Sequence, residues 1–397
     1  MSAQCLGKLQ LIFIPLIFSL FSGCGGGGNE SSPSVQETFK NYSYQQPDAL
    51  NDGWETGHLN DFSIDAGPYE ALVKNIVDAK SGYRHIDSVM VIKSGKVIFD
   101  ESFRTELDFA DDWAENKDLN LHVLNSVTKS FTSSLIGIAI EQGYIESVDI
   151  NVHDFFQHKL PVANWTDEKA NISLKNWLTM RHGYLWDEWN VSYLESSNVN
   201  SQMNNAADPI NYLLSRPMET LPGETFAYST GVSFGIGRLL EHATGQSVTS
   251  FMKQNLFVPL GIEKYTYWSL DGQLHTGSAL YLSPRDMAKF GQLFLNKGVW
   301  NGQQVISESW IEESTHRYHD NGSWGYGYQW WSTSFDVNGQ QVDSYYADGF
   351  GGQYIFVIPA LDAVIIFTGR AYQDGEIEEY RAYNIMQNEI LPSLINE

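Results

Sequence analysis

Two β-rich segments, one near each end of the chain, constrain the fold more than any other feature. Residues 88–103 (SVMVIKSGKVIFDESF) contain two apolar runs around Lys93-Ser94-Gly95-Lys96, a pattern typical of a β-hairpin. Residues 353–369 (QYIFVIPALDAVIIFTG) contain two more runs, broken between Pro359 and Asp362. Because hairpins join antiparallel strands, these segments argue against a doubly wound parallel sheet.

The middle of the chain, about residues 125–315, has a helical pattern instead. In LSPRDMAKFGQLFLNKG, Ser283 can cap a helix and Pro284 suits its first turn, while Met287, Phe290 and Phe294 share a face. A helix is also expected from Asp374 to Leu391, ended by Pro392.

These patterns predict an α/β (α+β) fold. We expect an antiparallel β-sheet formed by the N- and C-terminal segments, flanked by helices, with an inserted and mainly helical lobe. The expected bounds are about 53–124 and 316–397 for the sheet lobe and about 125–315 for the helical lobe. The two lobes would meet in one cleft.

The N-terminus has the composition of an export signal. Residues 1–23 contain one basic group, Lys8, followed by an apolar run too short for a confident transmembrane span. The ending FSGC resembles a bacterial lipobox, so we expect lipidation at Cys24 and a flexible Gly/Ser-rich tether over residues 24–52. The expected location is the bacterial cell envelope, facing the periplasm; ordinary cleavage to a secreted protein is the alternative.

Charge and cysteine usage exclude several classes of partner. The formal net charge of −24 disfavours nucleic acids and anionic lipid surfaces, so membrane contact is expected only through a lipidated N-terminus. Both cysteines, Cys5 and Cys24, lie in the leader region, so the folded body has no disulfide. Metal-binding spacings such as H-E-x-x-H and nucleotide-binding glycine loops are absent, so no metal or cofactor is expected. The sequence does not indicate an oligomeric state.

A serine and a lysine stand at the start of an otherwise apolar segment, LNSVTKSFTSSLIGIAIEQG. Asn125 is a suitable helix cap and Gly143 can end the helix, which places Ser126 at the N-terminus. Lys129 follows one turn later on the same side. Burial would lower its pKa and yield an amine able to accept the serine proton. Alternatively, Lys129 is a surface lysine that follows a serine by chance.

Two later motifs support the catalytic interpretation. PGETFAYSTG contains Tyr228-Ser229-Thr230 about a hundred residues downstream, and YYADGFGGQYIF contains Ala347-Asp348-Gly349 before a late strand. In this order the motifs resemble the three-motif pattern of the serine β-lactamase and penicillin-binding protein superfamily. The chain is most similar to its class C-related serine hydrolases, which include esterases and 6-aminohexanoate-dimer hydrolase.

The resemblance implies a role for each matching residue. Ser126 would be the acylated nucleophile, Lys129 its general base, and Tyr228 the proton relay to the leaving group, held near its anionic form by Lys129. The oxyanion hole would use the backbone N–H groups of Ser126 and Phe350, with Gly351 as the fallback. Small-molecule esters or amides are the implied substrates.

The chain departs from the family pattern at two positions. Thr230 stands where relatives often have Asn, so an amide contact to substrate is lost or altered. Ala347 replaces the Lys or His of the third motif, and Asp348 would repel the carboxylate of a β-lactam or D-Ala-D-Ala peptide. These changes favour neutral or cationic substrates. A β-lactamase or carboxypeptidase, and a catalytically weak binding protein, remain alternatives.

Other candidate residues have weaker support. Ser233 in GVSFG matches a nucleophile elbow, but the alternating βα pattern of an α/β-hydrolase is absent. An intact His275-Thr276-Gly277 precedes a helix rather than the final hairpin, so we interpret it as a coincidence. His182 suits a helix end.

A loop rich in aromatic residues follows His182 and would border the cleft. The candidates for lining the substrate site come from three parts of the chain; they are Tyr184, Trp186, Asp187 and Trp189, Trp330 and Trp331, and the motif residues Thr230, Asp348 and Gly349.

Overall fold

A computed structural model describes residues 34–372 and 381–395. The predicted signal segment 1–23, the proposed lipidation site Cys24 and the tether up to residue 33 lie outside the described residues. Residues 374–380 of the last predicted helix do so too. Within the described part of the chain, no helix is long and apolar enough to cross a membrane.

A nine-stranded mixed sheet forms the larger lobe, in the order β1-β3-β2-β16-β15-β14-β13-β12-β11. All neighbouring strands are antiparallel except β1 and β3. Its strands come from both ends of the chain, which confirms the predicted fold class. They are β1 Glu55–Thr56, β2 Ile86–Lys93, β3 Lys96–Ser102, β11 His319–Asp320, β12 Trp324–Tyr326, β13 Trp331–Val337, β14 Gln340–Gly349, β15 Gln353–Ile358 and β16 Ala363–Gly369.

Both predicted hairpins are present. Lys93 pairs with Lys96, and the two residues between them, Ser94 and Gly95, have φ angles of 49° and 75°. Positive φ at both central positions is what the tight turn of a twisted hairpin requires. The second hairpin joins β15 to β16 through a short 3₁₀ turn, Pro359–Leu361.

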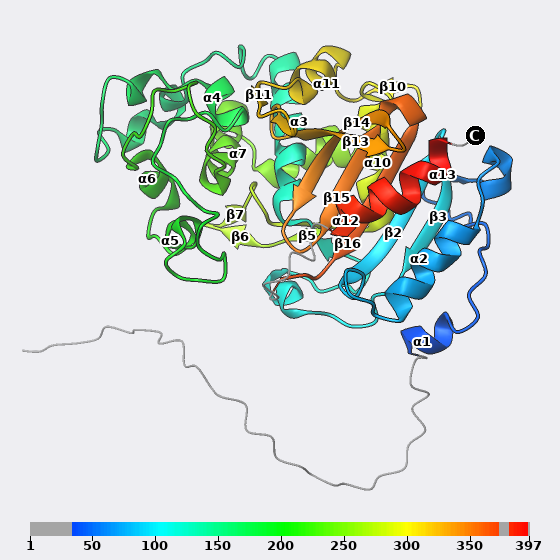
Figure 1. The fold of residues 1–397 in the computed structure, drawn as a ribbon. Helices are drawn as coiled ribbons and strands as arrows, with labels where there is room; N and C mark the ends of the chain where they lie inside the picture. Colours follow the sequence, from blue (N-terminus) through cyan, green and yellow to red (C-terminus); the bar gives the residue numbers. More distant parts are fainter. Residues whose placement is uncertain (1–33, 373–380, 396–397) are drawn as a thin grey trace, which may run out of the picture. The chain divides into compact units, whose positions relative to one another are not determined.

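Helices cover both faces of the sheet (Figure 1). The helix α2 (Gly67–Val77) and the C-terminal helices α12 (Arg381–Ile385) and α13 (Leu391–Ile395) pack with Val89, Val91 and their neighbours in one apolar cluster. The alternate residues Met90 and Ile92 belong to the other cluster. Successive side chains of a strand point to opposite faces, so the central strands are buried on both sides.

On that second face, α10 (Pro284–Leu295) packs directly on the sheet. A Cβ on Gly291 would lie 2.6 Å from Val364 and 2.9 Å from Ile355, so glycine permits this close approach. The predicted cap is confirmed, because the Ser283 side chain accepts a hydrogen bond from the Asp286 N–H.

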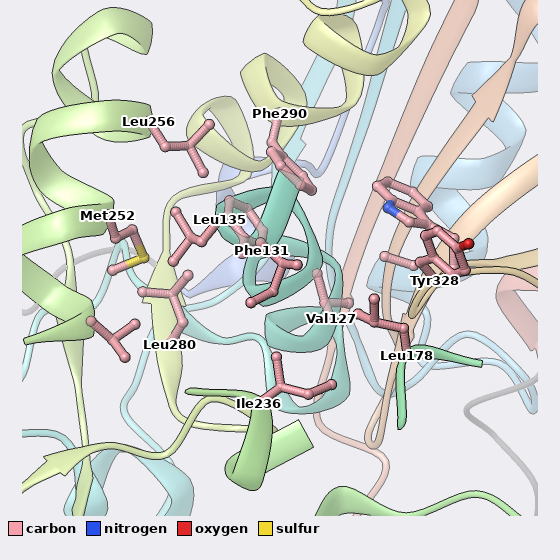
Figure 2. Packing of buried hydrophobic residues seen from close by; sticks show 14 of the residues in the cluster. Val127, Phe131, Leu135, Leu178, Ile236, Met252, Leu256, Leu280, Phe290 and Tyr328 are labelled. Carbon is pink, nitrogen blue, oxygen red and sulfur yellow. The ribbon is translucent and has the colours of Figure 1, made fainter. Parts of the chain in front are cut away.

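The remaining helices and short strands form the inserted lobe, whose centre is α3 (Thr128–Glu141). Figure 2 shows Phe131 and Leu135 of α3 packed among side chains from several elements, and the Phe131 ring stacks on Phe290 at 3.8 Å. The other helices are α4 Leu174–Leu178, α5 Val199–Asn204, α6 Pro209–Leu214, α7 Thr230–Thr244, α8 Val248–Met252, α9 Val258–Leu260 and α11 Glu308–Thr315. The short strands are β4 His122–Val123, β5 Thr266–Tyr267, β6 Ser269–Leu270, β7 Gln273–Leu274, β8 Leu280–Leu282, β9 Val299–Trp300 and β10 Gln303–Gln304.

Three predicted boundaries are wrong. Residues 34–52 are not simply tether: a helix α1 forms at Val35–Thr38, and Tyr44, 6% exposed, donates to the Ile98 carbonyl. The α10 helix lies within the segment assigned to the helical lobe but covers the sheet. Pro392 does not end the last helix, because the π-helical turn Met386–Ile390 runs directly into α13, which continues past Pro392 to Ile395.

Candidate active site

Ser126 lies in a 3₁₀ turn, Asn125–Val127, that directly precedes α3. Asn125 has a φ of 46°, and its Nδ2 donates to the Phe350 carbonyl at 2.6 Å. The prediction that Asn125 caps the helix is therefore wrong. Its side chain instead ties the serine turn to the end of β14, on the other lobe.

Lys129 is buried, with 1% of its surface exposed, and its amine touches the serine. The Nζ atom lies 2.9 Å from Ser126 Oγ, 3.1 Å from Thr230 Oγ1 and 2.8 Å from the Gly277 carbonyl oxygen. Burial lowers the pKa of Lys129 to about 7, although the charges of Glu188 and Asp348 oppose the shift. The alternative of a surface lysine is excluded by this geometry.

Tyr228 lies beside this pair, in a stack of aromatic rings. Its ring centroid is 4.9 Å from Lys129 Nζ and 5.2 Å from the Trp189 ring. Burial raises the pKa of Tyr228 well above its usual value, and a hydrogen bond with Ser126 offsets this only in part. Burial thus opposes the expected anionic form of Tyr228, because a buried phenolate would lack solvation.

Glu188 is a buried carboxylate that the sequence analysis missed. It is 1% exposed and accepts four hydrogen bonds. Oε1 accepts from the hydroxyls of Thr230 at 2.6 Å and Tyr193 at 2.8 Å, while Oε2 accepts from the Thr230 N–H at 2.8 Å and from Trp186 Nε1 at 2.7 Å. Thr230 at the start of α7 therefore links Lys129 to a carboxylate.

The Ala347-Asp348-Gly349 segment ends β14 beside the turn that contains Ser126. A Cβ on Gly349 would lie 2.2 Å from the Leu124 carbonyl oxygen, so only glycine lets β14 approach the serine turn this closely. Ala347 is buried, and Asp348 and Phe350 line a cavity together with Ser126.

Two cavities meet at Ser126, Tyr193 and Phe350, which line both. The first, of about 730 Å³, is completed by aromatic rings, polar groups and two carboxylates: Glu188, Trp189, Val191, Ser192, Tyr228, Ser323, Trp324, Trp331, Thr333, Tyr346, Asp348 and Tyr383. The second, of about 530 Å³, is completed by uncharged residues: Phe109, Trp113, Asn125, Leu194, Asn200, Ser201, Asn204, Asn205, Thr230, Trp268, Ser269, Ser278 and Tyr372. Among the described residues, no lysine, arginine or histidine lines either cavity.

Besides Trp330, four predicted lining residues do not reach these cavities, and Gly349 of the third motif is one of them. Tyr184 and Trp186 are buried in the core, and Asp187 is exposed, where its carboxylate accepts from the Trp189 and Asn190 N–H groups. The segment 184–188 alternates between buried and exposed residues, as an extended chain does. Glu188 therefore lies on the same buried side of this segment as Trp186, whereas Asp187 lies on the exposed side.

Of the remaining aromatic candidates, two line a cavity and one is buried in the core. Trp189 and Trp331 line the first cavity, whereas Trp330 is buried in the core beside Phe294.

The alternative catalytic candidates are structural. Ser233 is fully buried and donates to Gln329 Oε1 at 2.6 Å. His182 contacts the Ala227 carbonyl through Nε2, and burial lowers its pKa to about 4. His275 and Thr276 are buried, but the adjacent Gly277 supplies the carbonyl that binds Lys129. Within the described residues, no group of three or more His, Cys, Asp or Glu side chains could hold a metal.

The fold and the site together define a protein of the β-lactamase fold. The chain belongs to the Beta-lactamase family, whose model matches residues 72–387. The predicted family resemblance is thereby confirmed.

Known proteins with similar sequence or structure are hydrolases and penicillin-binding protein homologues. The 6-aminohexanoate-dimer hydrolase of Paenarthrobacter ureafaciens is 23% identical over 274 residues, which are 62% of this chain and 65% of that protein. A Bacillus anthracis protein proposed to be such a hydrolase has a TM-score of 0.66 at 18% identity, covering 89% of this chain and 91% of that one. A penicillin-binding protein homologue from Pyrococcus abyssi has a TM-score of 0.58 at 18% identity, with 81% and 77% covered.

Proposed function

We propose that this protein is a serine hydrolase that cleaves ester or amide bonds through a covalent acyl-enzyme at Ser126. The observation that carries the proposal is the set of contacts around the Lys129 amine. A buried amine with a pKa of about 7 is largely neutral just above that pH, and it then has two N–H donors and one lone pair.

The two donors have partners that can only accept. The Gly277 carbonyl is one of them, and Thr230 Oγ1 is the other, because the Thr230 proton is already donated to Glu188. The lone pair of Lys129 is thus left for Ser126, whose Oγ lies 2.9 Å away. This arrangement suits an amine that takes the proton of the serine hydroxyl.

The proposed reaction has two steps. Ser126 Oγ attacks the substrate carbonyl as its proton passes to Lys129, and the Ser126 and Phe350 N–H groups stabilise the oxyanion. The bond to the leaving group then breaks as Tyr228, neutral because its pKa is raised, relays a proton to that group. Water attacks the acyl-enzyme in the same way, which releases the acid and restores Ser126.

The lining of the cavities supports esters and amides without a carboxylate near the scissile bond. A β-lactam or a D-Ala-D-Ala peptide carries such a carboxylate, and no cation of the described lining residues would pair with it. The Glu188 and Asp348 carboxylates would repel it instead.

Active-site labelling tests the assignment. Wild-type protein is expected to hydrolyse p-nitrophenyl esters and to react covalently with a fluorophosphonate probe, and Ser126→Ala is expected to lose both properties. Ser233→Ala is the matched control, because its hydroxyl is buried against Gln329. Labelling that persists in Ser126→Ala and disappears in Ser233→Ala would overturn the proposal.

A further inference from the structure

The second cavity differs from the first in charge. Its described lining residues include amides, hydroxyls and aromatic rings but no charged side chain. Three of the amides, those of Asn200, Asn204 and Asn205, come from α5 and its C-terminal cap. The first cavity, in contrast, contains the Glu188 and Asp348 carboxylates.

Among the described residues, the side-chain amide of Asn200 has no hydrogen-bond partner. The residue is 8% exposed, its Oδ1 is buried without a hydrogen bond, and its Nδ2 bonds to none of the described residues. Asn204 differs, because its Oδ1 contacts His275 Nε2 at 3.2 Å. A buried amide is normally paired, and Oδ1 is sealed from the cavity, so the Nδ2 group of Asn200 is the candidate for donating to an acceptor on a ligand.

Hydrogen bonds fix Asn200 relative to the catalytic residues. Asn198 caps α5 by accepting from the Asn200 N–H at 2.8 Å, and its Nδ2 donates to the Glu188 carbonyl at 3.0 Å. Ser201 Oγ donates to the Tyr193 carbonyl at 3.0 Å. The Asn200 backbone is thus held by the same loop that supplies the Glu188 carboxylate.

The proposed mechanism assigns one half of the substrate to each cavity. Tyr228, which relays the proton to the leaving group, lines only the first cavity, so the leaving group belongs there. Asn125 and Thr230 line only the second cavity, which shares Ser126 with the first. The acyl group is then left to the second cavity.

We propose that the second cavity is the acyl subsite and that it selects an uncharged acyl group bearing an amide or hydroxyl that hydrogen-bonds to the side chain of Asn200. This inference rests on the proposed acyl-enzyme function. A charged acyl group would lose its hydration without gaining an opposite charge.

A panel of p-nitrophenyl esters with one leaving group tests the selection. The hexanoyl ester is the apolar reference, and the N-acetyl-β-alanyl ester places an amide in a chain of equal length. The 3-hydroxyhexanoyl ester carries the hydroxyl alternative, and glutaryl and 4-trimethylammoniobutanoyl esters carry opposite charges. We expect kcat/KM for the amide or the hydroxyl ester to exceed that of the hexanoyl ester roughly five- to tenfold. Both charged esters should be the slowest.

Asn200→Leu removes the amide with little change in volume. The preference over the hexanoyl ester is expected to disappear in this variant, with hexanoyl turnover retained. Gln202→Leu is the matched control, since it removes an amide from the exposed side of the same helix. The wild-type panel decides the question even if Asn200→Leu does not fold.

The inference is overturned if the wild type prefers the hexanoyl ester or a charged ester, or if Asn200→Leu keeps the preference. Failure of the proposed function would be different: no ester of the panel would turn over and Ser126 would not be labelled.

Discussion

Lys129 Nζ lies 3.1 Å from Thr230 Oγ1, whose hydroxyl donates to Glu188 at 2.6 Å. The orientation of the Thr230 hydroxyl therefore decides the direction in which the lone pair of a neutral Lys129 amine points. This link connects the start of α7 to the loop that precedes α5, and it leads to three of the predictions below.

The pH dependence of turnover should follow the Lys129 amine. Because its pKa is about 7 and only the neutral form accepts the serine proton, kcat/KM is expected to rise as the pH increases through about 7. Lys129→Met should lose roughly 10²–10⁴-fold in kcat. A pH–rate profile and single-turnover kinetics measure both effects; an unchanged rate in Lys129→Met would contradict the role.

Thr230→Val should lower the rate of catalysis while leaving the volume of the side chain nearly unchanged. The variant removes the acceptor for Lys129 and a donor to Glu188, so kcat/KM is expected to fall roughly tenfold. Thr230→Ser, which keeps the hydroxyl, should restore most of the rate. Equal losses in the two variants would contradict a specific role of the hydroxyl, because Thr230→Ser retains it.

Glu188→Gln should move the pH profile. The Glu188 charge raises the pKa of Lys129, so its removal lowers that pKa further. The acid limb of kcat/KM is therefore expected at lower pH than in the wild type, whereas a purely structural role would reduce the rate without moving the limb. In this variant the new amide NH₂ group would face N–H and O–H donors that Glu188 accepts from in the wild type. Thermal unfolding should therefore show a loss of stability of about 1–3 kcal/mol.

The Asn125 side chain should matter for positioning Phe350. Asn125→Gly permits the φ of 46° but removes the bond to the Phe350 carbonyl, so kcat is expected to fall roughly fivefold. Asn125→Ala should lose a similar part of kcat and, in addition, about 1 kcal/mol of folding stability from the left-handed backbone. Thermal unfolding and ester turnover, measured on both variants, separate the two effects.

The envelope location is a separate proposal that depends on Cys24. If the lipobox-like ending FSGC is processed, Cys24→Ser should abolish incorporation of radiolabelled palmitate and move the protein from the membrane fraction to the soluble fraction. A wild-type protein that is unlabelled and found in the soluble fraction would instead favour simple secretion.

The sequence predicted the sheet and the central pair well, because both depend on local patterns. The turn at Ser94-Gly95 and the apolar runs around it are sufficient for a hairpin, and a Lys129 one turn after Ser126 must share its side of a helix. The prediction that Asn125 caps the helix was wrong, because the side chain of a residue suited to capping can also bond to a distant carbonyl, here that of Phe350.

Other parts of the site depend on contacts that no motif encodes. The contact from Gly277 is made by its backbone carbonyl, which any residue could supply, so the residue type at this position gives no signal. Glu188 could have been found, since Tyr184, Trp186 and Glu188 alternate with polar or exposed positions. That alternation places Glu188, rather than Asp187, on the inner side of an extended segment.

The meeting of two separately lined cavities at one serine has an evolutionary consequence. Under the proposed mechanism, substitutions around Asn200 would alter which acid the protein releases, whereas substitutions around Trp331 would alter which alcohol or amine departs. Descendants of such a protein can therefore acquire new substrates one half at a time, without rebuilding the catalytic residues between them.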